Sequence, residues 1–568
     1  MPTNPTRIRI TPDTVLFLFT VLLALGLRCA FLFADSLGAN EARLAVQALN
    51  LLNGGGVSLD DTGSVLFIGL SFFLFGDNDL AARLPAALTS SATVASVWFL
   101  RPWIGNWGSL LSGLLLATSP TISYLSPRLG AAAVAILLIL FMAWKVARFA
   151  YSDRPERSLL WSIAITLPLL FVLGPIGIAG ILLIATYLVV DYFLFDDGLL
   201  GGSNLEVRVV GPYLVASLWV GLVLISPAIG GSADARLPGV ASFSDLFRMP
   251  ISGYGPLLPW ARLLAYDLAL LLLGVASMVF LLIFHGRAIL SRKDSRSAFQ
   301  RFILVWIAVA TFAVLLSGPG HHSLLVFLLT PLGINTGFLF QRILEDLGLP
   351  EWRRYIYRFG VSGALFFCAV ISVGIASTVG ANQRIDIIML AVSSLILIGL
   401  VLLWPLRSLR SGLGNLMLGI FAIGVFMNLH TASFLGSNDN GSELLIPPAV
   451  GHNTIKTVRD LAKIGPDVIS DKSVSVAVQL SLEYPFEWYL RDAASLSFST
   501  PSGTEDLYLS ITDDNDLRPG YTKISLPYLA GWRSDGLKIK EGIRWLYYRE
   551  APPARREVSS LFVWTKRL

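Results

Sequence analysis

Long apolar runs separated by short polar connections fill residues 14–433, and short mixed segments follow from about residue 436. The runs are rich in Leu, Val, Ile, Ala and Phe and do not alternate in polarity, so they predict helices rather than strands. Most are close to 20 residues long, the length at which a helix crosses a bilayer. We therefore predict about thirteen transmembrane helices, at residues 14–34, 80–101, 107–125, 129–148, 158–174, 176–195, 209–228, 261–285, 302–317, 323–341, 359–378, 385–404 and 412–433.

A shorter apolar run at residues 64–75 is too short to span the bilayer comfortably. We interpret it as a re-entrant segment within a long outer loop, residues 35–79. The same loop contains Asn40–Asn53, in which apolar residues recur at helical spacing. We expect this stretch to form a helix that lies along the membrane surface.

Charge fixes the expected orientation. Only 14% of the 568 residues are charged, against about 25% in soluble domains. If residues 64–75 do not cross, nineteen basic residues fall in the loops of one side and five in those of the other: Arg43, Arg128, Arg236, Arg248 and Arg384. The positive-inside rule then places the N-terminus in the cytoplasm of an inner-membrane protein. This bias also accounts for the basic excess, so we expect no nucleic-acid partner.

The tail differs from the rest of the chain. Short β-rich runs, such as Ser473–Leu480 and Gly542–Tyr548, alternate with helical signals and turns of Gly, Pro and Asp. We predict a transmembrane domain at residues 1–435 and an extracytoplasmic α/β domain at residues 436–568. The two cysteines, Cys29 and Cys368, lie in apolar stretches, so the sequence indicates neither a metal site nor a cofactor.

Several short motifs occur in a characteristic order. Their residues are Asn40-Glu41-Ala42-Arg43, Phe75-Gly76-Asp77-Asn78 continuing to Ala82-Arg83-Leu84-Pro85, Ser126-Pro127-Arg128, Leu173-Gly174-Pro175, and His321-His322 ahead of Pro331. With thirteen spans and a C-terminal outer domain, this order resembles the GT-C class of membrane glycosyltransferases. The aminoarabinose-transferase and protein O-mannosyltransferase branches are the most similar. Such a protein takes a sugar from a polyprenyl-phosphate donor at the outer membrane face.

The resemblance implies roles for several residues. An acceptor hydroxyl needs a base, and Glu41 or Asp35 is the candidate. The lipid phosphate needs cations to hold it, and the candidates are Arg43, Arg128, His321 and His322. In the structural alternative, Glu41 pairs with Arg43 or Arg128 and caps the surface helix, while Arg83 reaches the headgroups.

The chain departs from the family pattern where the chemistry is expected. Asn40 replaces the leading Asp of the first-loop motif, and an amide cannot accept a proton at neutral pH. No carboxylate occurs in residues 129–135, where the second outer Asp is expected, and Leu173 replaces a Lys. The Lys of a Lys-Pro-Pro motif is also missing, in residues 61–64.

These losses favour a GT-C-like membrane protein without catalytic activity. It would serve as a scaffold or accessory subunit among other membrane-protein subunits, in an electron-transfer or cell-envelope assembly. The alternative is an active glycosyltransferase that moves a sugar from a polyprenyl-phosphate donor to a lipid, protein or glycan. Arg28 and Asp267 also lie inside predicted spans, where a charge suggests either function or a structural partner.

Overall fold

The computed structural model describes most of the chain, and every structural statement below refers to the part it describes. That part is residues 12–32, 36–55, 62–149 without 129, 157–194, 212–223 without 214, 258–316 without 293, 323–346, 409–437, 450–464, 474–513 without 494 and 500–504, 521–532 and 556–566, together with residues 443, 445, 545 and 549.

The chain forms two compact units. The first consists of Met1–Arg28, Ala86–Leu224 and Leu237–Ala432, and the second of Cys29–Pro85, Ile225–Arg236 and Ser433–Leu568. The first outer loop therefore groups with the C-terminal residues, although more than 340 residues separate them in the sequence. The sequence places its domain boundary at residue 435, so this grouping was not anticipated.

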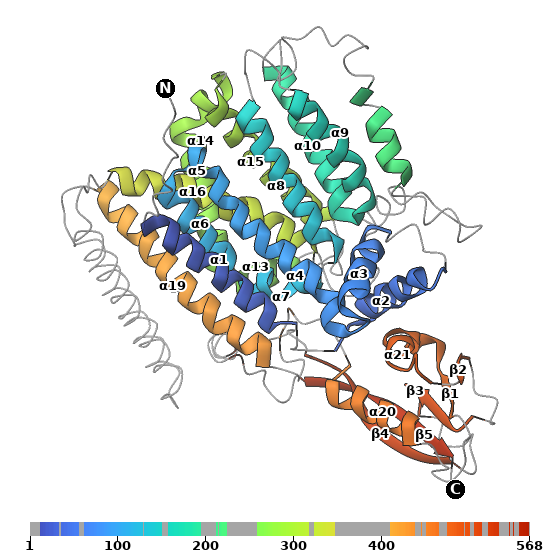
Figure 1. Ribbon diagram of the computed structural model, residues 1–568. Helices are drawn as coiled ribbons and strands as arrows, with labels where there is room; N and C mark the ends of the chain where they lie inside the picture. Colours follow the sequence, from blue (N-terminus) through green and yellow to red (C-terminus); the bar gives the residue numbers. More distant parts are fainter. Residues whose placement is uncertain are drawn as a thin grey trace, which may run out of the picture. The chain divides into compact units, whose positions relative to one another are not determined.

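The first unit is helical (Figure 1). Its elements are α1 (Pro12–Ala30), most of α4 (Asp79–Ser96), η2 (Val97–Leu100), α5 (Arg101–Ile104), α6 (Asn106–Thr118), α7 (Pro120–Leu125), η3 (Ser126–Arg128), α8 (Ala131–Phe149), α9 (Arg157–Val172), α10 (Gly174–Leu194), α13 (Leu258–Tyr266), α14 (Leu268–Ser291), α15 (Ser295–Leu316), α16 (Ser323–Asp346) and most of α19 (Leu409–Ser437). Among the described residues, seven helices are long and apolar enough to cross a membrane. The predicted spans at 359–378 and 385–404 lie outside the described residues, so the count of thirteen stays a prediction.

Two predicted spans are each broken into two helices. The span expected at 107–125 is α6 followed by α7, because Ser119 leaves the helical region and its hydroxyl accepts a hydrogen bond from the Ile122 amide at 3.2 Å. The span expected at 261–285 is α13 followed by α14, because Asp267 has a non-helical backbone. The buried Asp267 carboxylate accepts a hydrogen bond from the Thr121 amide at 3.3 Å. The intramembrane acid thus ties the break before α14 to the start of α7.

Close backbone contact joins α6 to α16. A side chain at Gly108 would lie 2.5 Å from the Gly337 carbonyl oxygen, and one at Gly333 would lie 2.5 Å from Leu116. Small residues at a helix interface allow this approach, which replaces the hydrophobic effect as the source of association inside a membrane. Glycine at these positions therefore fixes which faces of α6 and α16 meet.

The second unit begins with the helices of the first loop, α2 (Ala39–Leu52) and α3 (Thr62–Phe75), and continues into the start of α4. The apolar run predicted to be re-entrant is α3. The path from Thr62–Phe75 to Asp79–Ile104 bends by 116°. Gly76 allows the turn through its positive φ of 82°, and Asn78 caps α4 by accepting a hydrogen bond from the Ala81 amide. Such a bend occurs in broken spans and in re-entrant segments alike, so the re-entrant assignment stays a prediction.

The C-terminal part of this unit is a mixed sheet with helices. Its elements are α20 (His452–Ile464), β1 (Ser475–Val478), η4 (Leu480–Leu482), α21 (Glu483–Tyr489), β2 (Ser495–Phe498), β3 (Leu507–Ser510), β4 (Tyr521–Trp532) and β5 (Arg556–Lys566). The strand order is β2-β1-β3-β5-β4, with β1 parallel to both β2 and β3 and with β5 antiparallel to β3 and β4. Figure 1 shows these strands in orange and red. The predicted α/β character of the tail is confirmed, and β1 lies within the run Ser473–Leu480.

One hydrophobic core holds the second unit together. It joins buried residues of α2 and α3 to those of α21 and the sheet, including Ala45, Phe72, Phe486 and Trp488. The rings of Phe72 and Trp488 stack with centroids 5.5 Å apart. The C-terminal residues thus supply part of the apolar surroundings in which the first loop folds.

Candidate functional site

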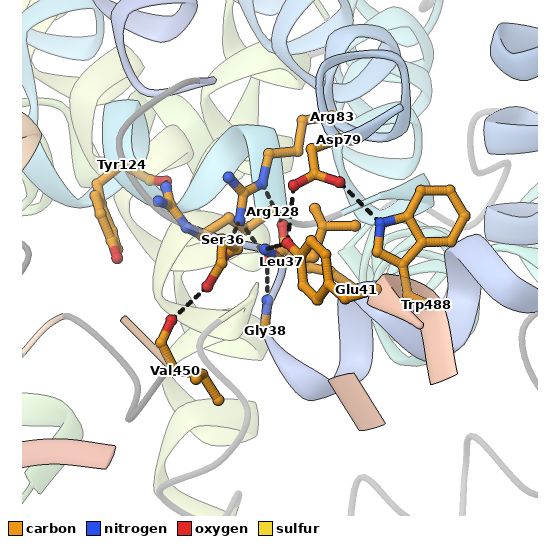
Figure 2. A network of polar contacts seen from close by, with 11 residues as sticks. Ser36, Leu37, Gly38, Glu41, Asp79, Arg83, Tyr124, Arg128, Val450 and Trp488 are labelled. Atoms are coloured by element: carbon orange, nitrogen blue, oxygen red, sulfur yellow. Dashed lines mark hydrogen bonds and ion pairs between the residues drawn. The ribbon is translucent and has the colours of Figure 1, made fainter. Parts of the chain in front are cut away.

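The centre of the second unit is an ion pair between Glu41 and Arg83. The Arg83 Nε donates to Glu41 Oε1 at 2.7 Å, and Nη2 donates to Oε2 at 2.7 Å (Figure 2). Arg83 is buried, with 1% of its surface exposed, and Glu41 is half-buried. Two parallel bonds of this kind fix both side chains in one geometry.

Local sequence places both partners. Glu41 is the third residue of α2, and its Oε2 accepts a hydrogen bond from the Gly38 amide at 2.9 Å, which satisfies a free donor at the helix start. Arg83 lies in the second turn of α4, and its Nη2 also donates to the Ser36 carbonyl oxygen at 2.9 Å. Arg83 thus binds both the first turn of α2 and the chain that leads into it.

A second acid in the same region, Asp79, is bound by the C-terminal residues. Its Oδ1 accepts from Trp488 Nε1 and its Oδ2 from the Tyr489 hydroxyl, both at 2.8 Å. The Tyr489 hydroxyl in turn accepts from the Leu37 amide at 2.7 Å. Burial, followed by the Asp79 charge, raises the pKa of Tyr489, so the phenol stays neutral and keeps its proton for Asp79. We call Glu41, Arg83, Asp79, Trp488 and Tyr489 the first-loop cluster.

The edge of this cluster is polar and more exposed. The Arg491 guanidinium lies 4.0 Å above the Trp488 ring and pairs with Asp77 at 3.3 Å. Ser36 contributes a further link, because its hydroxyl donates to the Val450 carbonyl oxygen at 2.5 Å. The first loop and the C-terminal residues are therefore joined by polar contacts as well as by their shared core.

The other predicted site residues are placed as follows. Asn40 is exposed at the start of α2. Arg43 is half-buried, and its charge acts on the nearby Tyr484. Arg128 belongs to the first unit, where its Nη1 donates to the Tyr124 carbonyl oxygen at 2.7 Å and its guanidinium covers the Tyr124 ring at 3.8 Å. Asp35, His321 and His322 lie outside the described residues.

Arg28, a further charged residue inside a predicted span, is bound by neutral oxygens. It is fully buried in the first unit, and Nε donates to the Ser90 hydroxyl at 2.8 Å. Its Nη1 donates to the Ala24 carbonyl oxygen at 3.0 Å, and its Nη2 to that of Leu116 at 3.4 Å. These contacts join α1 to α4 and α6, so the buried Arg28 stabilises the packing of these helices.

Sequence reasoning missed the partners inside the first-loop cluster. The structural alternative named Arg43 or Arg128 as the partner of Glu41 and did not name Arg83, with which Glu41 forms an ion pair. The contact between Asp79 and Trp488 joins residues 409 positions apart. Asp79 stands within the motif Phe75–Pro85, but no spacing rule connects it to Trp488. Among the described residues, no group of three or more His, Cys, Asp or Glu side chains could hold a metal ion.

Comparison with known proteins identifies the fold. Residues 63–230 match the family described as dolichyl-phosphate-mannose-protein mannosyltransferase. The crystal structure of ArnT from Cupriavidus metallidurans bound to undecaprenyl phosphate is similar, with a TM-score of 0.54 over 85% of each chain at 16% identity. The apo structure of the same protein gives a TM-score of 0.52 over 86% of each chain at 17% identity. This chain has the GT-C fold.

The GT-C fold confirms the predicted fold class, a polytopic helical membrane protein with a C-terminal sheet region. At 16–17% identity, the likeness to ArnT concerns architecture alone. No curated protein sequence matches the chain significantly. The activity of this GT-C protein therefore has to be argued from its own residues.

Proposed function

We propose that this GT-C-fold membrane protein does not transfer sugars and acts as a scaffold or accessory subunit of a larger membrane assembly. Its N-terminus would lie in the cytoplasm and its C-terminal sheet region outside. The observation that carries the proposal is the bidentate ion pair between Glu41 and Arg83.

A general base needs a lone pair that can reach the proton of the acceptor. Both oxygens of Glu41 accept hydrogen bonds from Arg83, and Oε2 also accepts from the Gly38 amide. Protonation of Glu41 would cost this ion pair and leave a buried arginine without its counter-charge, which is strongly unfavourable. These contacts favour a structural role for Glu41.

The residue beside Glu41 supports the same proposal. Asn40 is exposed and stands where the related glycosyltransferases have an aspartate, and its amide cannot take up a proton. Asp79, the other acid of the first-loop cluster, is occupied by Trp488 and Tyr489. Each carboxylate in this cluster is thus bound in a way that holds the loop together.

Active glycosyl transfer remains the second candidate. It is favoured by the likeness to ArnT, a protein whose structure was determined with undecaprenyl phosphate and which this chain matches over 85% of each length. In that case a polyprenyl phosphate would be the lipid partner. Glu41 or Asp35 would be the base, and Arg43, Arg128, His321 and His322 would hold the phosphate.

Donor turnover separates the two candidates. The purified protein in liposomes is supplied with a polyprenyl-phosphate-linked sugar and with membranes as the source of acceptors, and the release of polyprenyl phosphate is measured. We expect no release above that of empty liposomes, and no difference between the wild type, Glu41→Gln and Asp35→Asn. Turnover by the wild type that Glu41→Gln abolishes would establish the enzyme instead.

The accessory role needs a partner. Chemical cross-linking in native membranes, followed by purification in a mild detergent, should recover at least one membrane protein in a fixed ratio to this chain. A light-scattering mass equal to that of the isolated chain, with no cross-linked partner, would contradict the accessory role even if no sugar transfer were found.

A further inference from the structure

A cavity of about 230 Å³ lies among the ends of three neighbouring helices of the first unit, α14, α15 and α16. Its basic lining residues are Arg292, Arg296, Arg342 and His285. The C-terminal end of α14, the N-terminal end of α15 and the C-terminal end of α16 meet here. By the distribution of basic loop residues, this end is the one expected to face the cytoplasm.

The charges of this cavity are not balanced. Three guanidinium groups face two carboxylates, Asp294 and Glu345. Glu345 lies 3.7 Å from Arg342, but within the described ranges neither Arg292 nor Arg296 makes an ion pair. His285 adds a buried Nδ1 that has no hydrogen-bond partner among the described residues. The cavity therefore offers positive charge and hydrogen-bonding capacity to an anion.

The backbone that carries these residues is held in place. Arg301, on α15, donates from Nη1 to the carbonyl oxygens of Ile289 at 2.6 Å and Arg292 at 3.1 Å. Its Nη2 pairs with the buried Asp191 of α10 at 3.2 Å. Trp103 also donates to the Ser295 hydroxyl at 3.2 Å. The turn between α14 and α15 is thus anchored before any ligand binds, which lowers the entropy cost of binding.

The neighbouring surface indicates what kind of anion would bind. Leu281, His285 and Arg292 line the cavity from one side of α14, whereas Ile283 and Phe284, on the same turns, are each 69% exposed. In a membrane protein such an exposed apolar face contacts lipid chains. Phe280 and Phe338 add apolar surface to the cavity wall itself. An anion with attached acyl chains can use both surfaces, whereas a soluble anion can use only the charged one.

We propose that this cavity binds the phosphate headgroup of an anionic phospholipid of the inner leaflet. Its volume is below the roughly 300–1,000 Å³ of ordinary small-molecule pockets, as suits a headgroup whose chains stay in the bilayer. Basic pockets between transmembrane helices on the cytoplasmic side are suited to this chemistry. The site is independent of sugar transfer and would serve an enzyme and a scaffold equally.

The test measures lipid retention by the full-length protein. The protein is purified from nanodiscs that contain equal amounts of phosphatidylglycerol and phosphatidylcholine, and the lipids that remain bound are counted by native mass spectrometry. The wild type should retain phosphatidylglycerol in clear excess. Equal retention of the two lipids by the wild type would overturn the proposal without the need for any variant.

The double variant Arg292→Gln and Arg296→Gln locates the site. We expect it to bind phosphatidylglycerol about 30-fold more weakly, on the basis of roughly fivefold for each basic residue near a charged membrane surface. The matched control is Arg287→Gln, because Arg287 lies on α14 and is exposed, as Arg292 and Arg296 are, but does not line the cavity. Unchanged retention by the double variant, or an equal loss in the control, would reject this location.

Inorganic phosphate and glycerol 3-phosphate distinguish a lipid from a soluble phosphate. Neither should displace phosphatidylglycerol at millimolar concentration if the acyl chains contribute to binding. Displacement by either compound at a concentration similar to that of the lipid would show that the occupant is a soluble phosphate, and the lipid assignment would fail.

Discussion

The first-loop cluster and the cavity among α14, α15 and α16 are both built from arginines and carboxylates, but they use them differently. In the cluster, Arg83 binds both oxygens of Glu41, and Asp79 is bound by Trp488 and Tyr489. In the cavity, Arg292 and Arg296 line open space and form no ion pair with any described residue. Charges engaged by the protein's own groups stabilise the fold, whereas charges left beside a cavity are available to a ligand.

This contrast bears on how a GT-C fold is interpreted. The motif residues that lead to the expectation of catalysis, Glu41 and its neighbours, belong to the engaged group. Arg292 and Arg296, which form no ion pair with a described residue, lie outside the motifs that resemble the GT-C class.

The largest effect is expected at Arg301, where the protein holds a deeply buried pair. Arg301→Met leaves the Asp191 carboxylate buried without its counter-charge and releases the turn before α15. We expect a loss of about 3–5 kcal/mol in the free energy of unfolding, measured by denaturant unfolding in detergent. The added change Asp191→Asn should recover much of this loss, and a single variant as stable as the wild type would contradict the anchoring role.

Arg83→Met breaks the central pair of the first-loop cluster. Because 16% of the Glu41 side chain is exposed, whereas the Asp191 side chain is fully buried, water can partly compensate the charge of Glu41, and we expect a smaller loss of about 3 kcal/mol. The measurement is limited proteolysis of the first loop together with thermal unfolding. In the double variant with Glu41→Gln no charge is left unpaired, so its stability should lie between that of the single variant and the wild type. If Glu41 were instead a free base, Arg83→Met would leave the fold unchanged.

Trp488→Phe separates the polar contact from the packing contact. Phenylalanine keeps an aromatic ring against Phe72 but removes the donor to Asp79, so we expect a loss of about 2 kcal/mol, as for other hydrogen bonds to a charged group. Thermal unfolding reports the change. In the control Asp79→Asn, the amide oxygen can still accept the hydrogen bond from Trp488 Nε1. We therefore expect Asp79→Asn to lower the stability less than Trp488→Phe does. If Trp488→Phe left the stability unchanged, ring packing on Phe72, and not the hydrogen bond to Asp79, would account for the contribution of Trp488.

Alkaline pH should weaken the second unit, which contains Tyr484. Burial, followed by the charges of Glu487 and Glu483, raises the pKa of Tyr484 from 10.0 to about 12. A group whose pKa is higher in the folded state stabilises the fold below its unfolded pKa, and this stabilisation is lost as pH rises through the folded pKa. We therefore expect stability to fall between about pH 10 and pH 12. Ultraviolet absorbance of the phenolate follows the titration, and Tyr484→Phe should reduce the loss.

The sequence predicts structure most reliably where a property of one continuous stretch, such as its apolar length, determines the element. Apolar runs such as those of α10 and α15 predicted helices because a chain in lipid must satisfy its own backbone hydrogen bonds. It was less informative at Ser119 and Asp267, where spans that look continuous are broken. The broken backbone is tolerated because Asp267 accepts a hydrogen bond from Thr121 on another helix, and that contact has no signature in either stretch alone.

The amino-acid sequence is enough to predict a polytopic GT-C protein with a C-terminal α/β region, because the lengths of the apolar runs and the order of the motifs can be read along the chain. The roles of the charged residues depend on the partners that folding brings to them. The partner of Glu41 lies 42 positions away and that of Asp79 lies 409 positions away, and folding alone brings them within hydrogen-bond distance. A carboxylate's role follows from the donors that surround it in space, and those that bind Asp79 belong to Trp488 and Tyr489, which share the hydrophobic core of the second unit.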